Sequence, residues 1–349
     1  MGSQLMTFMK SAETGRRVRN ISELAKLAGV SAGTVSRALA GKDLVNRQTR
    51  ERIQALAREH GFRPNQLASR LRTGQTGVIG VVIPLGHEQF QALSDPFFMT
   101  LIGALADAVT ERGYDLMLSR VIPDGGDDWL ARIADSGMVE GLLVIGQSDQ
   151  YEAIEQLAAD YRPLVVWGTH KAGQRHCAVG TDSLIGGRLA AQHLLDRGAR
   201  RLAFLGETKG IEIAQRLEGA RAAVAESGTG ATLEAFPTRL AINGLTAQVA
   251  AQLDRMDPAT DGIVAASDII AMVVLRVLHE RGRKVPEEIA VIGYDDLPMA
   301  VQTVPQLTSV HQDIAAGARA MVGCLFRRLA GEDAGSTVLE PQVIVRESA

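Results

Sequence analysis

The chain has 349 residues, of which 46% are hydrophobic and 22% charged, as in globular proteins large enough for two or three domains. Its net charge of −3 conceals an uneven distribution, because residues 1–74 carry 14 Lys and Arg against 5 Asp and Glu, while the remainder carries 23 against 35. A basic N-terminal segment on an acidic body favours nucleic-acid contact through that segment, although a basic solvated face is the alternative.

Several classes of protein lack support in the sequence. Cys177 and Cys324 are far apart and form no CxxC pair, so we expect neither a disulfide framework nor a metal site. The apolar run within residues 1–17 is too short for a signal peptide, and no stretch approaches the ~20 apolar residues of a membrane helix. We therefore expect a soluble, cytoplasmic protein without membrane contact, in which residues 1–17 form a flexible tail.

Residues 21–39 predict two short helices joined by a tight turn. An apolar helical pattern runs from Ile21 to Leu27 and stops at Gly29, and a second pattern begins at Ser31, a typical N-cap residue. The outer side of the second helix carries small, polar and basic groups that suit the major groove of DNA: Ser31, Ala32, Gly33, Ser36 and Arg37. The pattern is typical of a helix-turn-helix, although an ordinary helical hairpin in an enzyme shares it.

A third helix is predicted after this pair. Asn46 can cap its start, Ile53 and Leu56 recur at helical spacing, and Gly61 ends it. Three helices can bury a small but feasible core, so we expect residues 18–63 to form a helix-turn-helix DNA-binding domain.

Residues 64–77 are expected to form a hinge helix and a linker. Pro64 prevents extension of the preceding helix, and Asn65 can cap a short helix that ends at Leu71. A helix of so few residues is marginal alone in water, so it needs a surface to pack against.

From residue 78 onward, apolar strands alternate with helices. Strands are predicted at 78–83, 114–119, 141–146, 164–168, 178–181, 201–206, 233–236, 262–266 and 289–295, with helices at 97–112, 185–197 and 214–227. Near-continuous apolar strands between helices predict parallel sheets covered on both faces. Because so many strands exceed one doubly wound sheet, we expect residues 78–349 to form an α/β core with two sheets. Ligands bind beyond the carboxyl ends of such strands, where Arg120, Gln147 and Trp167 lie.

The sequence contains no catalytic or nucleotide-binding signature. The first strand is followed by Pro84 without a GxGxxG or GxxxxGK[ST] pattern, and the 7 His residues form no HExxH. Ser31 has GxSxG spacing but lies between two predicted helices, so it forms no strand-to-helix elbow. We therefore expect no cofactor and no enzyme activity, with an α/β dehydrogenase or sugar kinase as a remote alternative.

Motifs along almost the whole chain match one protein family. The N-terminal part contains LAKLAGVS, GTVSRAL, TRERI and GFRPNQLASRLRTG, and the remainder contains RLAFLGE, ASD, GYDDLPMA and PQLTSVHQD. With these motifs, residues 18–74 resemble the head of the LacI–GalR family of bacterial transcription regulators, and residues 78–346 resemble its effector-binding core. The resemblance implies a periplasmic-binding-protein-like core of two lobes, a homodimer and a pseudo-palindromic DNA operator.

The resemblance also assigns DNA contacts, which are Ser31, Ala32, Thr34, Ser36 and Arg37 of the second helix and Asn65, Ala68 and Leu71 of the hinge. Arg37 suits either a bidentate contact with guanine or a phosphate contact. Leu71 suits either a wedge between base pairs in the minor groove or packing within the dimer. Ala32 and Gly33 stand where the family usually has larger side chains, so no operator sequence transfers from relatives.

The expected effector contacts, taken from the resemblance and the strand ends, are Phe97, Arg120, Gln147, Trp167, Asp182, Arg188, Arg216, Asp295 and His87. Arg188 and Asp295 match family positions that grip sugar hydroxyls. Asp295 also ends a buried strand, where a carboxylate needs a partner.

Some of these effector contacts have a structural alternative. Asp182 can equally cap a helix, as can Asp268, which we leave out of the site. Trp167 can stack on a sugar or belong to the core. His87 lies in a segment, residues 85–96, that is longer than its family counterpart and either reaches the ligand or forms a surface insertion.

We therefore expect a DNA-binding transcriptional regulator, specifically a repressor, whose operator affinity depends on a small effector bound between the lobes. The expected effector is a sugar, with a purine or another metabolite as the alternative, and activation is the alternative to repression. A periplasmic solute receptor with the same core is a remote alternative, because the chain has a basic head and no signal peptide.

Overall fold

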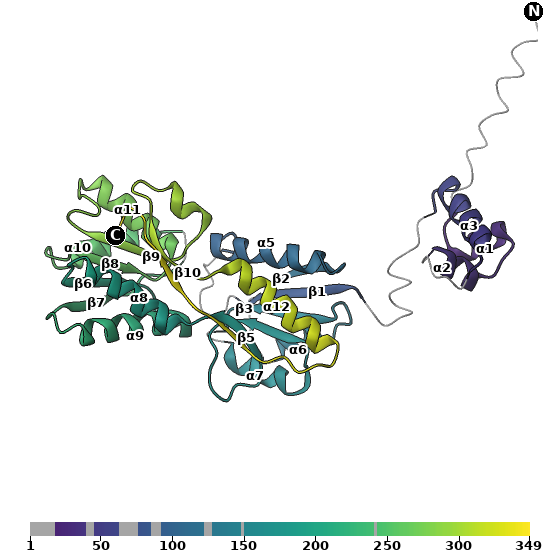
Figure 1. The fold of residues 1–349 in the computed structure, drawn as a ribbon, viewed down its shortest axis with the longest axis horizontal. Helices are drawn as coiled ribbons and strands as arrows, with labels where there is room; N and C mark the ends of the chain where they lie inside the picture. The colour runs from purple at the N-terminus through teal and green to yellow at the C-terminus, as the bar shows by residue number, and fades with distance from the viewer. Residues whose placement is uncertain are drawn as a thin grey trace, which may run out of the picture. The chain divides into compact units, whose positions relative to one another are not determined.

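The structure, a computed structural model, describes residues 18–39, 45–62, 76–84, 92–121, 128–147, 150–240 and 243–349. The chain divides into two compact units, a head that extends to Thr76 and a core that begins at Gly77 (Figure 1). Among the described residues, no helix is both long enough and apolar enough to span a membrane.

The described part of the head consists of α1 (Ile21–Ala28), α2 (Ala32–Leu39) and α3 (Arg47–Glu59). The side chain of Asn20 caps α1 by accepting a backbone N–H of the first turn at 2.9 Å, and Gly29 ends it with a left-handed φ of 63°. Ser31 caps α2, because its Oγ accepts from a backbone N–H at 3.1 Å. Asn46 caps α3 in the same way. Gly29 and Ser31 together form the tight turn between α1 and α2 that the sequence predicts.

A small apolar core holds the head together. Leu24 of α1, Val35 of α2 and Ile53 of α3 are fully buried and pack in one cluster. Arg52 Nη2 donates to Ala28 O at 2.6 Å, which ties α3 to the turn between α1 and α2. The inner sides of the helices are thus used for stability, and the outer side of α2 remains exposed.

The core contains two sheets, and each is the centre of one lobe. The N-lobe sheet has the strand order β11-β5-β4-β3-β1-β2, and the C-lobe sheet has the order β12-β10-β9-β8-β6-β7. The N-lobe strands are β1 (Val78–Pro84), β2 (Asp115–Val121), β3 (Gly141–Ile145), β4 (Leu164–Trp167), β5 (Cys177–Thr181) and β11 (Thr337–Leu339). The C-lobe strands are β6 (Arg201–Leu205), β7 (Thr232–Phe236), β8 (Gly262–Ala265), β9 (Ala290–Asp295), β10 (Thr308–His311) and β12 (Gln342–Ile344). Neighbouring strands are parallel, except that β12 is antiparallel to β10.

Helices cover both faces of the N-lobe sheet, namely α5 (Pro96–Thr110), α6 (Trp129–Ala134), α7 (Tyr151–Asp160) and α12 (Ile314–Leu329). Along β1, Val81 and Ile83 are buried with residues of α5 and α12, whereas Val82 is buried with residues of α6 and α7. Successive side chains of a strand point to opposite faces, so a sheet covered on both sides requires an uninterrupted apolar run. Figure 1 shows α12 beside α5, although the two helices are far apart in sequence.

The C-lobe sheet is covered by α8 (Ser183–Asp196), α9 (Ile211–Glu226), α10 (Leu245–Arg255) and α11 (Asp268–Glu280), and a short 3-10 helix spans Pro298–Gln302. Phe204 of β6 and Val291 of β9 are fully buried in its core. The helices α8 and α9 pack closely because Gly187 and Gly219 allow their backbones to approach.

The chain crosses between the lobes after β5, after β10 and after β11. The crossing segments are hydrogen-bonded to one another, because Thr181 Oγ1 donates to Gln312 O at 3.1 Å and Asp182 N donates to Leu339 O at 3.2 Å. The connection between the lobes therefore consists of three crossing segments that are hydrogen-bonded to one another. The expected α/β class and the two-lobed core are both confirmed.

Candidate functional site

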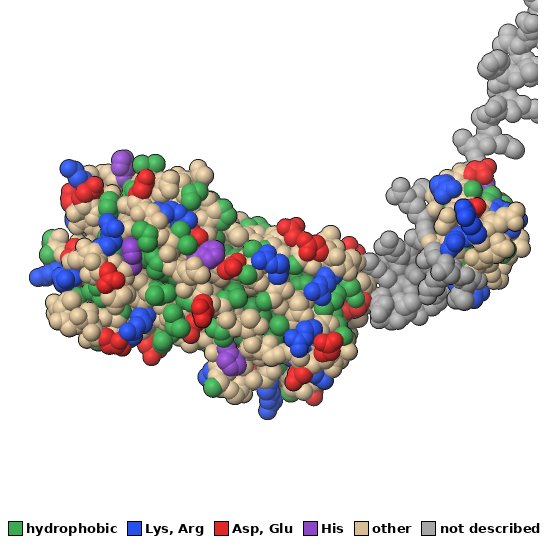
Figure 2. All heavy atoms as spheres, in the orientation of Figure 1, with side chains coloured by type: hydrophobic (Ala, Val, Ile, Leu, Met, Phe, Trp, Pro, Cys, Tyr) green, Lys and Arg blue, Asp and Glu red, His purple; other side chains and the backbone are tan. Residues whose placement is uncertain are grey.

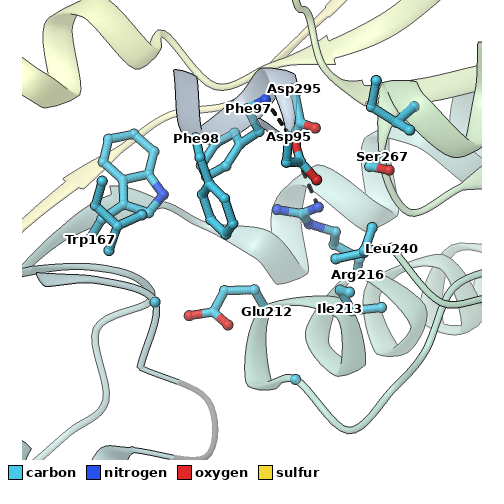
Figure 3. A pocket seen from close by; sticks show the side chains of 14 residues that line it. Asp95, Phe97, Phe98, Trp167, Glu212, Ile213, Arg216, Leu240, Ser267 and Asp295 are labelled. Atoms are coloured by element: carbon cyan, nitrogen blue, oxygen red, sulfur yellow. Dashed lines mark hydrogen bonds and ion pairs between the residues drawn. The ribbon is translucent and has the colours of Figure 1, made fainter. Parts of the chain in front are cut away.

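A cavity of about 130 Å³ lies between the two lobes, at the carboxyl ends of their strands (Figure 3). The N-lobe contributes Asp95, Phe97, Phe98, Ile145, Gly146 and Trp167, and the C-lobe contributes Gly210, Glu212, Ile213, Arg216, Leu240, Ser267, Ile269 and Asp295. We call this space the interlobe cavity. Parallel sheets place ligands at this edge, and the volume exceeds that of a single water molecule several times, so a small polar molecule can occupy it.

Arg216 of α9 and Asp295 at the end of β9 form the charged centre of the C-lobe wall. Arg216 Nη1 lies 4.0 Å from Asp295 Oδ1 and donates to Ala266 O at 2.6 Å. The guanidinium carbon of Arg216 lies 3.6 Å from the centroid of the Tyr294 ring. Gln312, from the crossing segment after β10, donates to Asp295 Oδ1 at 2.6 Å. The buried carboxylate of Asp295 thus has the partners that its burial requires.

The protonation of Asp295 depends strongly on its surroundings. Burial raises its pKa to about 7; the Arg216 guanidinium opposes this rise, and the Asp95 carboxyl adds to it. Asp295 can therefore act as a neutral hydrogen-bond donor below that pH and as an anionic acceptor above it.

Aromatic rings form the N-lobe wall of the interlobe cavity (Figure 3). The Phe97 ring lies 5.9 Å from the Phe98 ring and 6.0 Å from the Trp167 ring, measured between centroids. Asp95 Oδ1 accepts from Phe97 N at 2.9 Å and so caps α5, which fixes where the two phenylalanines enter the cavity. Such rings offer an apolar surface to the C–H side of a sugar, while the opposite wall offers charged and polar groups.

A network of polar side chains links the two lobes beside the cavity. Gln147 Nε2 donates to Thr169 O at 2.8 Å and to Glu212 Oε1 at 3.0 Å. Thr169 Oγ1 donates to Gln215 Oε1 at 2.9 Å. Because the Gln147 amide nitrogen faces two acceptors, its oxygen must face His176 Nε2, which is 3.2 Å away. Gln147, Thr169 and His176 belong to the N-lobe, so α9 of the C-lobe is held to it through Glu212 and Gln215.

The outer side of α2 carries the candidate DNA contacts of the head. Ser31, Ala32 and Arg37 are exposed, and Thr34 and Ser36 are half-buried. Arg37 Nε donates to a backbone carbonyl of its own helix at 3.2 Å, so this exposed side chain is held along α2. Figure 2 shows Lys and Arg side chains on the visible face of the head.

Comparison with known proteins identifies the family. A model of the bacterial regulatory proteins of the lacI family matches residues 20–65, and a periplasmic binding protein-like domain matches residues 191–349. The HTH-type transcriptional regulator CelR of Thermobifida fusca is 32% identical over 343 residues, which span 95% of this chain and 99% of that protein. The chain belongs to the lacI family of bacterial regulatory proteins. It is therefore a DNA-binding transcriptional regulator and not an enzyme.

Solved structures of relatives agree with this lacI-family assignment. A CelR–cellobiose complex, 29% identical, matches with a TM-score of 0.67 and covers 95% of this chain and 100% of that one. A lac repressor dimer bound to operator and the anti-inducer ONPF is 23% identical and has a TM-score of 0.82, covering 95% and 98% of the two chains. The lac repressor complex shows a shared fold.

Four of the expected effector contacts of this lacI-family regulator come together in the interlobe cavity, namely Phe97, Trp167, Arg216 and Asp295. Gln147 lies just behind its wall, because it is bonded to Glu212, which lines the cavity. Trp167 is 6% exposed, so it serves the core and the cavity wall at the same time.

Three other expected contacts lie elsewhere. Arg188 is exposed on α8, forms an ion pair with Glu226 and does not line the interlobe cavity. Arg120 is exposed on β2, an edge strand of the N-lobe sheet, and does not line the interlobe cavity. Asp182 accepts from Ile185 N at 2.9 Å, so its helix-capping alternative is confirmed.

Asp268 does not cap a helix as the sequence suggests. Ser267 caps α11 instead, and Asp268 is fully buried at the first position of that helix. Its carboxyl accepts from Leu297 N at 2.7 Å and from Ser309 Oγ at 2.5 Å. Burial, followed by the nearby Asp295, raises the pKa of Asp268 well above its usual range.

Some expected contacts lie outside the described residues. These are His87 of the 85–96 segment and Asn65, Ala68 and Leu71 of the hinge. They remain predictions from the sequence.

Asp95 and Glu212 line the cavity but were not expected from the sequence. Glu212 precedes Arg216 by four residues, so both lie on the same face of α9. The helical spacing from the predicted contact Arg216 could therefore have indicated Glu212 as a further contact. Asp95 directly precedes Pro96, a pairing that indicates only a helix start.

Proposed function

We propose that this regulator is a cytoplasmic repressor that binds a pseudo-palindromic operator as a homodimer and releases it when a sugar occupies the interlobe cavity. The observation that carries the proposal is the pairing of an aromatic N-lobe wall with a polar C-lobe wall around one small cavity. Relatives solved with cellobiose and with ribose support a sugar as the effector class.

The DNA contacts follow from the head. Ser31, Thr34, Ser36 and Arg37 lie on the accessible side of α2, where base edges in the major groove can be reached. We propose that residues 64–77 add a hinge helix whose Leu71 enters the minor groove, as inferred from the sequence.

The coupling between effector and operator follows from the position of the interlobe cavity. A ligand that contacts Phe97 and Trp167 on one lobe and Arg216 and Asp295 on the other favours one relative arrangement of the lobes. Asp295 also accepts a hydrogen bond from Gln312, which lies in a segment that crosses between the lobes. A ligand that contacts Asp295 can therefore change the conformation of this crossing segment. The equilibrium between lobe arrangements then sets the affinity for DNA.

Binding of the purified protein to a DNA fragment from upstream of its own gene tests this proposal. We expect binding that weakens steeply with salt, because the basic head displaces counterions, and that is reversed by a sugar from a panel of mono- and disaccharides. Asp295→Ala should abolish the sugar response and retain DNA binding. Arg188→Ala is the matched control, since Arg188 lies outside the cavity, and should respond normally.

The outcomes separate the parts of the proposal. If the protein bound no upstream fragment in a salt-dependent way, the proposal that the head binds an operator would be contradicted. Normal sugar release in Asp295→Ala would remove Asp295 from the effector site while leaving the regulator intact.

A further inference from the structure

The interlobe cavity carries an excess of acidic side chains. Asp95, Glu212 and Asp295 line it, and Arg216 is the one cationic side chain among its described lining residues. Asp95 and Asp295 are each 4% exposed, so their charges are poorly screened by water and salt. The excess of acidic groups persists when Asp295 is protonated, because Asp95 and Glu212 still line the cavity together with a single guanidinium.

The positive charge of Arg216 is already committed within the C-lobe. Its guanidinium bonds Ala266 O, lies over the Tyr294 ring and faces Asp295. A ligand anion that approached Arg216 would have to compete with the Asp295 carboxyl for it. The buried Nε of Arg216 has no hydrogen-bond partner among the described residues, so it can donate to a ligand hydroxyl. The positive charge of the guanidinium, however, already faces the Asp295 carboxyl and is shared with it when a negative ligand enters.

The acidic groups come from different elements and from both lobes (Figure 3). Asp95 begins α5 in the N-lobe, Glu212 lies in the first turn of α9, and Asp295 ends β9. A bound ligand consequently meets carboxylate oxygens on more than one side. Carboxylates only accept hydrogen bonds, so they favour a ligand with several O–H donors. A ligand carboxylate or phosphate brings further acceptors and a repelling charge into a site of low dielectric.

We propose that the interlobe cavity selects carbohydrates without a negative charge and rejects aldonic acids, uronic acids and sugar phosphates, with Asp95 and Glu212 as the specificity-determining residues. This inference rests on the proposed function, because it narrows the class of sugar that acts as effector. Asp295 has a smaller part in the rejection, because the Arg216 guanidinium lies 4.0 Å from its carboxyl and offsets the negative charge.

Calorimetric titration of the full-length protein tests this selectivity. The probes are mono- and disaccharides, each compared with its own aldonic acid and, for the monosaccharides, with its 6-phosphate. We expect each neutral sugar that binds to do so about tenfold or more tightly than its acidic forms.

Two charge-neutralising variants identify the residues responsible. Glu212→Gln keeps the size of the side chain, and Asp95→Asn keeps a residue that can cap α5. Either should narrow the gap between neutral and acidic sugars to about threefold or less. Glu226→Gln is the matched control, because Glu226 lies exposed on the same helix as Glu212 and outside the cavity, and it should leave the gap unchanged.

Equal or tighter binding of an acidic form by the wild-type protein overturns the selectivity while leaving a sugar-responsive regulator in place. A gap that persists in both neutralised variants also overturns it. If no sugar of either kind binds, while binding to the upstream DNA persists, the sugar effector of the proposed function fails and the selectivity fails with it.

Discussion

Asp295 occupies an unusual position for a carboxyl group. It ends a buried strand, has a φ of 115° and is 4% exposed. Gln312 and Arg216 supply partners, yet burial still raises its pKa to about 7. The surrounding structure holds Asp295 in an unfavourable backbone conformation and away from water. Such strained residues with a shifted pKa are typical of binding sites.

The raised pKa of Asp295 predicts how stability depends on pH. Between about pH 4 and about pH 7 the unfolded chain has lost this proton while the folded protein retains it, so the free energy of unfolding should fall as the pH rises through that range. Asp295→Asn should reduce this fall by roughly 4 kcal/mol over the whole range, as measured by urea unfolding. Part of the fall should remain, because the pKa of Asp268 is raised in the same direction. An identical pH dependence in the variant would contradict the assignment.

Single residues of the site were predictable from the sequence only where their type and position allowed one interpretation. Asp295 and Arg216 were predicted and do line the cavity. Ser267 and Asp268 are both favourable N-cap residues, so the sequence could not show that Ser267 is the cap and that Asp268 is buried. Arg188 was misassigned because exposure on α8 depends on how that helix packs against α9.

The packing of α8 against α9 places Arg216 in the cavity wall. A Cβ added at Gly187 would overlap the backbone carbonyl of Arg216, and a Cβ added at Gly219 would overlap the carbonyl of Leu184. Both overlaps are with backbone atoms, which cannot rotate away. The separation of the two helices, and with it the position of Arg216, therefore depends on residues that have no side chain.

Gly187→Ala should destabilise the core by roughly 1–3 kcal/mol and weaken the effector response, because the two helices must move apart and carry Arg216 with them. Gly323→Ala in α12 is the matched control, since a Cβ there meets no atom within 4 Å. It should be neutral or stabilise the protein by about 0.5–1 kcal/mol, because alanine favours a helix. Thermal unfolding and sugar titration of both variants measure these effects, and equal behaviour of the two would argue against close packing at Gly187.

The prominent strands and three of the helices of the core were predictable because their signals are local. Each strand predicted in the core agrees with the structure to within two residues, and the helices predicted at 97–112, 185–197 and 214–227 agree to within three. The strands β10, β11 and β12 have only three or four residues, and β11 and β12 lie at sheet edges, so their pairing depends on partners distant in sequence. The helix α12 packs in the N-lobe, although it follows β10 of the C-lobe in sequence. The lobe to which α12 belongs depends on contacts with residues distant in sequence, which a local pattern does not contain.

In the whole chain, the excess of positive charge lies in the N-terminal segment and the excess of negative charge lies in the remainder. The basic N-terminal segment coincides with the helix-turn-helix head, and the acidic remainder forms the core that holds the interlobe cavity. An acidic core is a poor partner for DNA, so we expect the phosphate contacts to come from the basic N-terminal segment. The core can then influence DNA binding only through its own geometry, which makes the contacts between its lobes decisive.

Thr169 and Gln215 provide a direct test of these interlobe contacts. Thr169 follows β4 in the N-lobe and donates from Oγ1 to Gln215 Oε1 on α9 at 2.9 Å. If the effector favours the arrangement in which this bond is made, Thr169→Val should weaken effector binding about three- to tenfold, the value of one hydrogen bond. Titration of the sugar against the operator complex and against the free protein measures this change.

A double-mutant cycle decides whether the effect of Thr169 arises between the lobes. Thr169→Val and Gln215→Ala should be strongly non-additive, with a coupling free energy of about 1 kcal/mol, because each removes the same bond. Ser227→Ala is the control, since Ser227 Oγ donates to Val224 O at the far end of α9 and does not contact the N-lobe. It should change effector binding little and combine additively with Thr169→Val. Additive losses for Thr169 and Gln215 would show that the two residues act separately and that the lobes communicate through the crossing segments instead.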